Sequence, residues 1–214
     1  AGKIAPPSGY PLFNSPTEVG DALVNIGFDV INHANNHVLD QGEKGIKATL
    51  DYWDTKPVKV VGAYRNDADL ENIRIVEAKG IKTAHIGITE MTNGLHLPKG
   101  SEYRLVYASD TKLIEHLIKK AKSMADVVVI SVHWGTENSY TLTETEKARA
   151  GNGGLGCGHY FRKSSACAAA AYRSDAQRRY AVPGHLLHRQ FRFHHAEGGR
   201  HGQRPFDRHH DEKF

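Results

Sequence analysis

A change of composition near Gly151 constrains the fold of this chain more than any other feature. Residues 151–214 contain no isoleucine and one valine, but 9 of the 13 arginines and 8 of the 14 histidines. They show no strand or helix period that would bury a core, and such a composition is typical of disordered segments. We therefore predict one domain, residues 1–150, followed by a disordered basic tail, residues 151–214.

The charge of the chain also separates these two segments. Residues 1–150 carry 17 Lys and Arg against 19 Asp and Glu, whereas the tail carries 11 against 5. The net charge of +4 therefore comes from the tail alone. Its arginines are not set in a recognisable nucleic-acid-binding fold, so we expect no nucleic-acid partner. Cys157, Cys167 and the paired histidines of the tail match no zinc-site spacing.

Residues 1–150 alternate between strand and helix patterns. Short β-branched runs bounded by turn residues predict strands, and apolar side chains at helical spacing predict helices. We predict strands at residues 27–32, 58–64 and 125–135, a hairpin at 73–90 that turns at Lys79-Gly80, and helices at 42–54 and 110–124. This alternation predicts a layered α/β domain.

Polar side chains follow two of the predicted strands. The stretch FDVINHANNHVLDQG, residues 28–42, leaves its strand through ANNH, and the strand at 125–135 ends in HWG. Open α/β sheets place their chemistry at the carboxyl ends of strands, where Asn, His and Asp side chains can hold catalytic metals. The structural alternatives are an Asn-rich turn for ANNH and a packed His-Trp pair for HWG. We expect His33 to be structural.

Residues 11–147 resemble the poly-gamma-glutamate capsule biosynthesis protein family (CapA-type). Two segments carry the resemblance: PLFNSPTEVGDALVNIGFDVINHANNHVLDQGEKGIKATLD and DVVVISVHWGTENSYTLTETEK. The first is similar to the family's F-N-x-P followed by G-F-D-V-x-x-x-A-N-N-H-x-x-D-x-G. The second is similar to its D-V-V-I-V-x-x-H-W-G-x-E.

The resemblance implies a calcineurin-like metallophosphatase fold, a layered α-β-β-α sandwich. It implies a role in synthesis or export of poly-gamma-glutamate or a related anionic envelope polymer, outside the cytoplasm at the cell envelope. Partners would be the anionic polymer or a small-molecule substrate, and other capsule-synthesis membrane proteins. The residues themselves show no signal-peptide pattern and no apolar run long enough to span a bilayer.

Two kinds of function are compatible with this resemblance. The first is a metal-dependent hydrolase that cleaves a phosphoester or amide-type bond with divalent Mn, Fe, Zn or Mg. The second is a non-catalytic scaffold or polymer-binding subunit of an envelope assembly complex. For the hydrolase, His37 would stabilise developing charge, and Asp40 would orient the ring of His37. The other implied positions are Asn36 and His133 as metal ligands, and Asn35, Trp134 and Glu137 as substrate-binding residues.

The chain departs from the family pattern at both ends. The family's early G-D-I-M and N-L-E motifs and its later G-x-H-P-H and Y-S-x-G-N-F motifs do not occur as written. We therefore expect a sandwich that is incomplete at both ends, with unpaired strand edges and marginal stability. We also expect weak metal binding and little or no activity from this chain.

The missing later motifs can be encoded by the tail in another reading frame. We read the last two bases of each codon with the first base of the next, choosing synonymous codons freely. Residues 159–168 can then encode I-I-F-G-N-H-P-H-V, and residues 186–193 can encode Y-S-I-G-N-F-V. We infer a single-base frameshift near residues 147–151; the alternative is a genuine basic tail.

Overall fold

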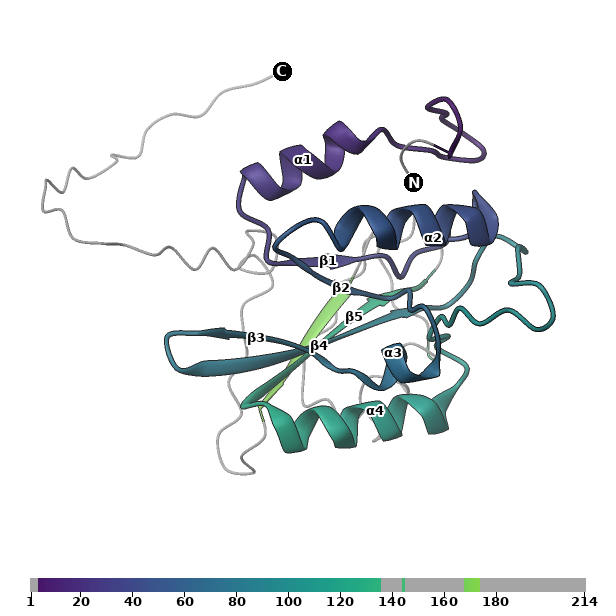
Figure 1. Ribbon diagram of the computed structural model, residues 1–214. Coiled ribbons are helices and arrows are strands. Elements are labelled where there is room, and N and C mark those ends of the chain that lie inside the picture. The colour runs from purple at the N-terminus through teal and green to yellow at the C-terminus, as the bar shows by residue number, and fades with distance from the viewer. Residues whose placement is uncertain (1–3, 136–143, 145–167, 174–214) are drawn as a thin grey trace, which may run out of the picture.

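The computed structural model describes residues 4–135, Glu144 and residues 168–173 (Figure 1). Along the chain, the elements are α1 (Thr17–Asn25), β1 (Val30–Asn32), α2 (Gly42–Trp53), β2 (Lys59–Val61), α3 (Asp67–Glu71), β3 (Arg74–Ala78), β4 (Ile81–Thr89), α4 (Thr111–Met124), β5 (Val127–His133) and β6 (Ala168–Arg173). Every strand and helix predicted above is present within these bounds, although the strands are shorter than predicted.

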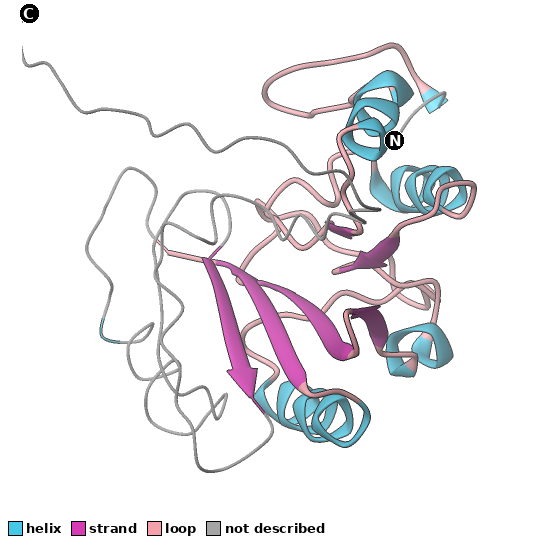
Figure 2. Cartoon of the chain, turned by 90° about the vertical axis from the view of Figure 1, so that its left-hand side faces the viewer, coloured by secondary structure: helices cyan, strands magenta, loops and turns pink. Residues whose placement is uncertain are grey.

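The strands form two sheets between two groups of helices. β1 and β2 pair in parallel, and the second sheet has the order β3-β4-β5-β6. In that sheet β4 and β5 are parallel, whereas β3 and β6 are antiparallel to their neighbours. Helices α1 and α2 lie beyond β1 and β2, and α4 covers the opposite side (Figures 1 and 2). The predicted layered α/β class is confirmed.

Two glycines allow the two sheets to approach closely. Gly62 directly follows β2 and has φ +88°, and Gly87 lies in β4. A Cβ atom added to Gly87 would lie 2.4 Å from Oδ1 of Asn32 and 2.9 Å from Cα of Gly62. Glycine is therefore required at this contact, because any side chain would push β2 and β4 apart. The contact fixes the end of β1, from which the ANNH turn departs.

The main core lies between α4 and the central strands. It is built from buried aliphatic side chains, including Ile86 and Ile88 of β4, Ile130 of β5, and Ile114 and Leu117 of α4. The first turn of α4 is capped by Asp110, whose carboxylate accepts a hydrogen bond from the backbone N–H of Leu113. A second cluster packs Ile46 and Leu50 of α2 against Leu39, Ala63 and Leu105. The apolar faces predicted for both helices are therefore the buried ones.

The strand β6 was not predicted. Residues Ala168–Arg173 lie in the segment expected to be disordered, yet they pair with β5 from Val132↔Ala168 to Val127↔Arg173. The expectation of disorder is wrong for these residues, which cover one edge of β5. Strand pairing uses backbone groups, so a run of alanines can occupy an open edge without an alternating pattern. The division of the chain at residue 150 otherwise stays a prediction.

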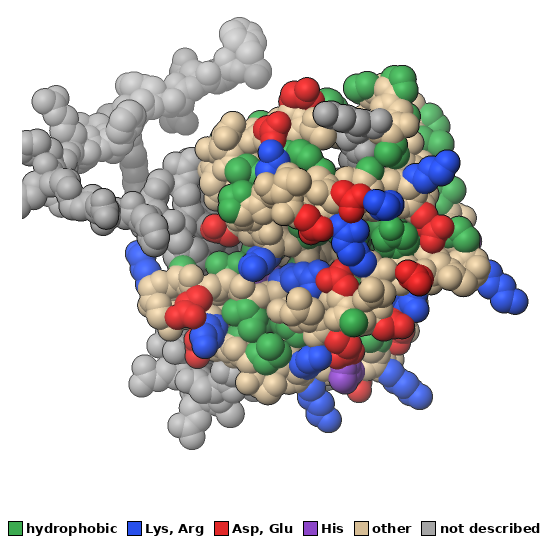
Figure 3. Space-filling model, viewed as in Figure 1, with side chains coloured by type: hydrophobic (Ala, Val, Ile, Leu, Met, Phe, Trp, Pro, Cys, Tyr) green, Lys and Arg blue, Asp and Glu red, His purple; other side chains and the backbone are tan. Residues whose placement is uncertain are grey.

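Acidic and basic side chains are interspersed on the face shown in Figure 3. Several form ion pairs, such as Arg104 with Asp67 at 2.6 Å and Arg74 with Asp69 at 2.6 Å. An exposed pair such as Arg104 with Asp67 contributes little to stability, whereas the pair of Arg74 with Asp69 is partly buried. Their mixture leaves this face without a large patch of one charge sign.

Candidate functional site

The ANNH turn is shaped by its own asparagine side chains. Asn32 Oδ1 accepts a hydrogen bond from the backbone N–H of Ala34 at 3.0 Å, and Asn35 Oδ1 accepts one from that of His37 at 2.8 Å. Such contacts let asparagine replace backbone partners in a tight turn. Asn35 therefore has the structural role considered as the alternative, while its predicted contact with substrate stays a prediction.

The closest functional pair in the turn is His37 and Asp40. Nδ1 of His37 lies 2.8 Å from Oδ2 of Asp40. The carboxyl side chain is 2% exposed and the imidazole 31%, so a buried acid holds a ring that reaches the surface. The same carboxylate oxygen accepts the backbone N–H of Phe13 at 2.8 Å, and the Phe13 ring packs edge-on against His37. This geometry supports the predicted orienting role of Asp40.

Asn36 is held by a residue that the sequence analysis missed. Its Nδ2 donates to Oδ1 of Asn93 at 3.2 Å, and Nδ2 of Asn93 lies 3.5 Å from Nδ1 of His37. Asn93 has φ +50°, a conformation that asparagine tolerates better than most residues. The Asn-Gly pair at 93–94 signalled only a turn, because nothing in the sequence tells which other turn it faces.

His133 lies at the end of β5 and approaches the ANNH turn. Burial lowers the pKa of this imidazole, and the nearby charge of His37 lowers it further. The sequence analysis also missed Glu90, which fixes the turn after His133. Its backbone N–H donates to the carbonyl oxygen of His133 at 2.8 Å, and its carboxylate accepts the N–H of Gly135 at 2.9 Å. The segments ANNH, 90–93 and HWG thus meet at one edge of the sheets.

Of the two remaining predicted site residues, Trp134 and Glu137, the structure describes only Trp134. Trp134 is 5% exposed and belongs to the main core, so it packs at the strand end as the structural alternative proposed. Its contact with a substrate stays a prediction. Glu137 lies outside the described residues.

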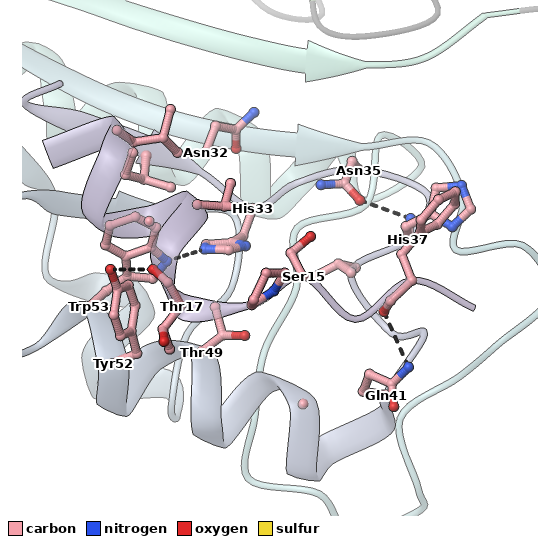
Figure 4. Close-up of a pocket in the computed structure, with 18 residues that line it drawn as sticks. Ser15, Thr17, Asn32, His33, Asn35, His37, Gln41, Thr49, Tyr52 and Trp53 are labelled. Atoms are coloured by element: carbon pink, nitrogen blue, oxygen red, sulfur yellow. Dashed lines mark hydrogen bonds between the residues drawn. The ribbon is translucent and has the colours of Figure 1, made fainter. Parts of the chain in front are cut away.

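His33 is bound to Trp53, as expected for a structural histidine. Trp53 Nε1 donates to Nε2 of His33 at 2.7 Å (Figure 4). Burial lowers the pKa of His33 to about 4, so the ring is neutral near pH 7. Because Nε2 accepts, the ring proton is on Nδ1.

The described residues meet part of the requirement for a divalent metal. Among them, Nδ1 of His133 is buried without a hydrogen-bond partner, and a neutral imidazole is a common metal ligand. The amide of Asn36 is held by Asn93 through its nitrogen, which leaves its oxygen as a ligand candidate. No group of three or more His, Cys, Asp or Glu that could hold a metal is found in the described part of the chain. Asn36 and His133 therefore fit two ligand positions, short of a complete centre.

The described helices can be compared with what a membrane-spanning helix requires. Within the described residues, no helix combines the length and the apolar character needed to cross a bilayer.

Comparisons with known proteins agree with the motifs. The chain is 35% identical to the capsule biosynthesis protein CapA of Bacillus anthracis over 138 residues, 62% of this chain and 33% of that protein. It is 32% identical to the PGA biosynthesis protein CapA of Bacillus subtilis strain 168 over 117 residues, 54% of this chain and 30% of that protein. The chain therefore spans about a third of the length of these curated relatives.

A solved structure described as a 5′-nucleotidase from Staphylococcus aureus, in complex with alpha-ketoglutarate, is also similar. The TM-score is 0.41 at 19% identity, over 57% of this chain and 24% of that one. The model of the bacterial capsule synthesis protein family PGA_cap matches residues 1–152, which is more than half of the chain. The match includes both the ANNH and HWG segments. This protein is therefore a member of the bacterial capsule synthesis protein family PGA_cap.

Proposed function

We propose that the edge formed by ANNH, 90–93 and HWG is a hydrolytic site that acts on a capsule polymer or its precursor. The contact between His37 and Asp40 carries this proposal. A buried carboxylate that holds an imidazole fixes the orientation of its ring. Since Nδ1 faces Asp40, Nε2 is the ring nitrogen that can meet a substrate oxygen.

The remaining residues have distinct roles in this proposal. Asn36 and His133 would hold the divalent ion, which when bound would supply a Lewis acid and an activated water. Asn93 positions the amide of Asn36, and Glu90 positions the backbone around His133. The ion would be divalent Mn, Fe, Zn or Mg.

Poly-gamma-glutamate or a related anionic envelope polymer is the substrate class that we propose, since one relative is described as a PGA biosynthesis protein. The site would then work outside the cytoplasm at the cell envelope. Other capsule-synthesis membrane proteins would be its partners.

A scaffold or polymer-binding subunit is the second candidate. It is favoured by one observation: the described residues do not gather three His, Cys, Asp or Glu side chains around a metal position. The His37–Asp40 pair would then stabilise the turn alone.

Hydrolysis by the protein with its tail restored to the alternative reading frame distinguishes the two candidates. The substrates are a chromogenic phosphodiester and poly-gamma-glutamate, with Mn²⁺ present. We expect His37→Gln and Asp40→Asn to lower kcat by about 10- to 100-fold, because each removes the oriented imidazole.

The matched control is His116→Gln. His116 is an exposed histidine of α4 that lies 2.9 Å from the carboxylate of Glu71. This substitution should leave kcat unchanged. Equal rates in all three variants, or an absence of hydrolysis in a folded and metal-loaded protein, would favour the scaffold.

A further inference from the structure

A cavity lies beside the candidate site, between α1, α2 and the end of β1. Its volume is about 340 Å³, near the lower end of the range for small-molecule sites. Asn35 and His37 belong to its wall, so the cavity continues from the candidate site (Figure 4). The rest of the wall comes from the segment before α1, from α1 itself and from the inner face of α2. The cavity is therefore large enough for one small unit of a larger substrate.

None of the described residues that line this cavity is Lys, Arg, Asp or Glu. Burial, together with a hydrogen bond to Asp21, raises the pKa of Tyr52 to about 12, so its hydroxyl is uncharged near pH 7. Moving a carboxylate or phosphate from water into such surroundings is costly without a counter-charge. The cavity thus disfavours the charged groups of an anionic polymer.

The same wall combines short neutral polar groups with apolar surfaces. The hydroxyls of Ser15, Thr17 and Thr49 lie around the space shown in Figure 4. Apolar surface is contributed by Leu23 and Val38. His33 lines the cavity as a neutral ring whose orientation is fixed by Trp53. A ligand that matches these walls has hydroxyl or amide groups on an apolar frame.

We propose that this cavity is a binding subsite for an uncharged sugar unit, placed next to His37. A sugar ring has C–H faces for the apolar wall and hydroxyl groups for Ser15, Thr17 and Thr49. As a subsite of the hydrolase it rests on the function proposed above, with a related anionic envelope polymer that carries sugar units as the substrate, because poly-gamma-glutamate contains no sugar. Binding of the sugar itself requires neither the metal nor hydrolysis, so the two proposals can fail separately.

Binding can be followed through Trp53, which touches the cavity wall. The full chain is labelled with ¹⁵N and treated with EDTA, and the indole N–H signal of Trp53 is assigned with Trp53→Phe. Glucose and N-acetylglucosamine are added in separate titrations, and glutamate and inorganic phosphate are added as anionic probes. We expect saturable shifts of the Trp53 signal with at least one neutral sugar and none with the anions.

Two variants of α2 test whether the cavity is the site. Thr49→Phe fills the space, whereas Thr55→Phe places the same side chain at an exposed position just beyond α2. Thr49→Val keeps the size and removes the hydroxyl, which tests the contact if Thr49→Phe does not fold. We expect Thr49→Phe to abolish the shifts, Thr49→Val to weaken affinity by about tenfold, and Thr55→Phe to leave it unchanged.

Three results would overturn the proposal. One is a Trp53 signal that stays fixed with both neutral sugars. Another is a shift produced by glutamate or phosphate in preference to the sugars. The third is sugar binding that persists unchanged in folded Thr49→Phe. Sugar binding by a protein that proves to lack hydrolysis would instead leave the subsite intact and remove only the hydrolase.

Discussion

At the scale of single residues, two half-buried histidines give the fold a specific dependence on pH. Burial lowers the pKa of both His33 and His85 from 6.5 to about 4. The unfolded chain therefore binds more protons than the folded chain between these values, so the free energy of unfolding falls as pH falls. The loss begins near pH 6.5 and is complete below about pH 4. Each histidine contributes at most about 3 kcal/mol.

Urea unfolding at pH 7 and pH 4.5 measures this effect. We expect the double variant His33→Gln plus His85→Gln to lose less stability between the two pH values than the unchanged chain. The control His96→Gln alters an exposed histidine and should keep the original pH dependence. An equal loss of stability in the double variant would show that other groups cause the acid sensitivity.

Single residues also show how far the sequence predicts the site. His37 and Asp40 could be paired in advance, because they are three positions apart in one recognisable motif. Asn93 and Glu90 could not, because they reach the site only through the packing of β4 beside β1 and β5. A turn such as Asn93-Gly94 indicates local geometry and carries no information about its distant neighbour.

At the scale of elements, the contact of β2 with β4 sets the geometry of the site. Gly87→Ala would place a methyl group against Oδ1 of Asn32 and the backbone of Gly62. We expect a loss of about 1–3 kcal/mol in the free energy of unfolding. We also expect NMR signals of the ANNH turn to shift, because Asn32 holds the start of that turn.

Gly9→Ala is the matched control, since a Cβ atom at Gly9 would meet no atom within 4 Å. Denaturant unfolding of both variants gives the comparison. If Gly87→Ala is as stable as Gly9→Ala, the glycine contact does not constrain the sheets.

The elements that the sequence predicted are those with a clear period. The helix α2 buries Ile46, Leu50 and Trp53 on one face, and the hairpin turns at Lys79-Gly80, where Gly80 readily adopts its positive φ angle. The elements that were missed lack such a signal. α3 has 5 residues, too few for an apolar period to repeat, and β6 begins with an alanine run. Pairing with the edge of β5 decides the conformation of β6.

At the scale of the whole molecule, the match to the family ends where the composition of the chain changes. The family model matches residues 1–152, and the basic, isoleucine-free segment begins at residue 151. This agreement supports the hypothesis of a frameshift near residues 147–151.

Sequencing the coding DNA from Thr141 past Phe214 tests the frameshift. We expect the alternative frame to encode G-N-H-P-H-V followed later by Y-S-I-G-N-F-V, because both strings are compatible with the codons of the tail. Stop codons or unrelated residues in that frame would mean that the basic tail is genuine.

The metal content of the frame-restored protein tests the proposed site most directly. It is measured by elemental analysis after dialysis, for the unchanged protein and for Asn36→Ala plus His133→Ala. The control is His96→Ala plus His116→Ala, which removes two exposed histidines. We predict bound divalent metal in the unchanged and control proteins, and its loss in the Asn36/His133 variant with the fold retained. Equal metal content in all three proteins, or none in any, would contradict a metal-dependent hydrolytic site at this edge.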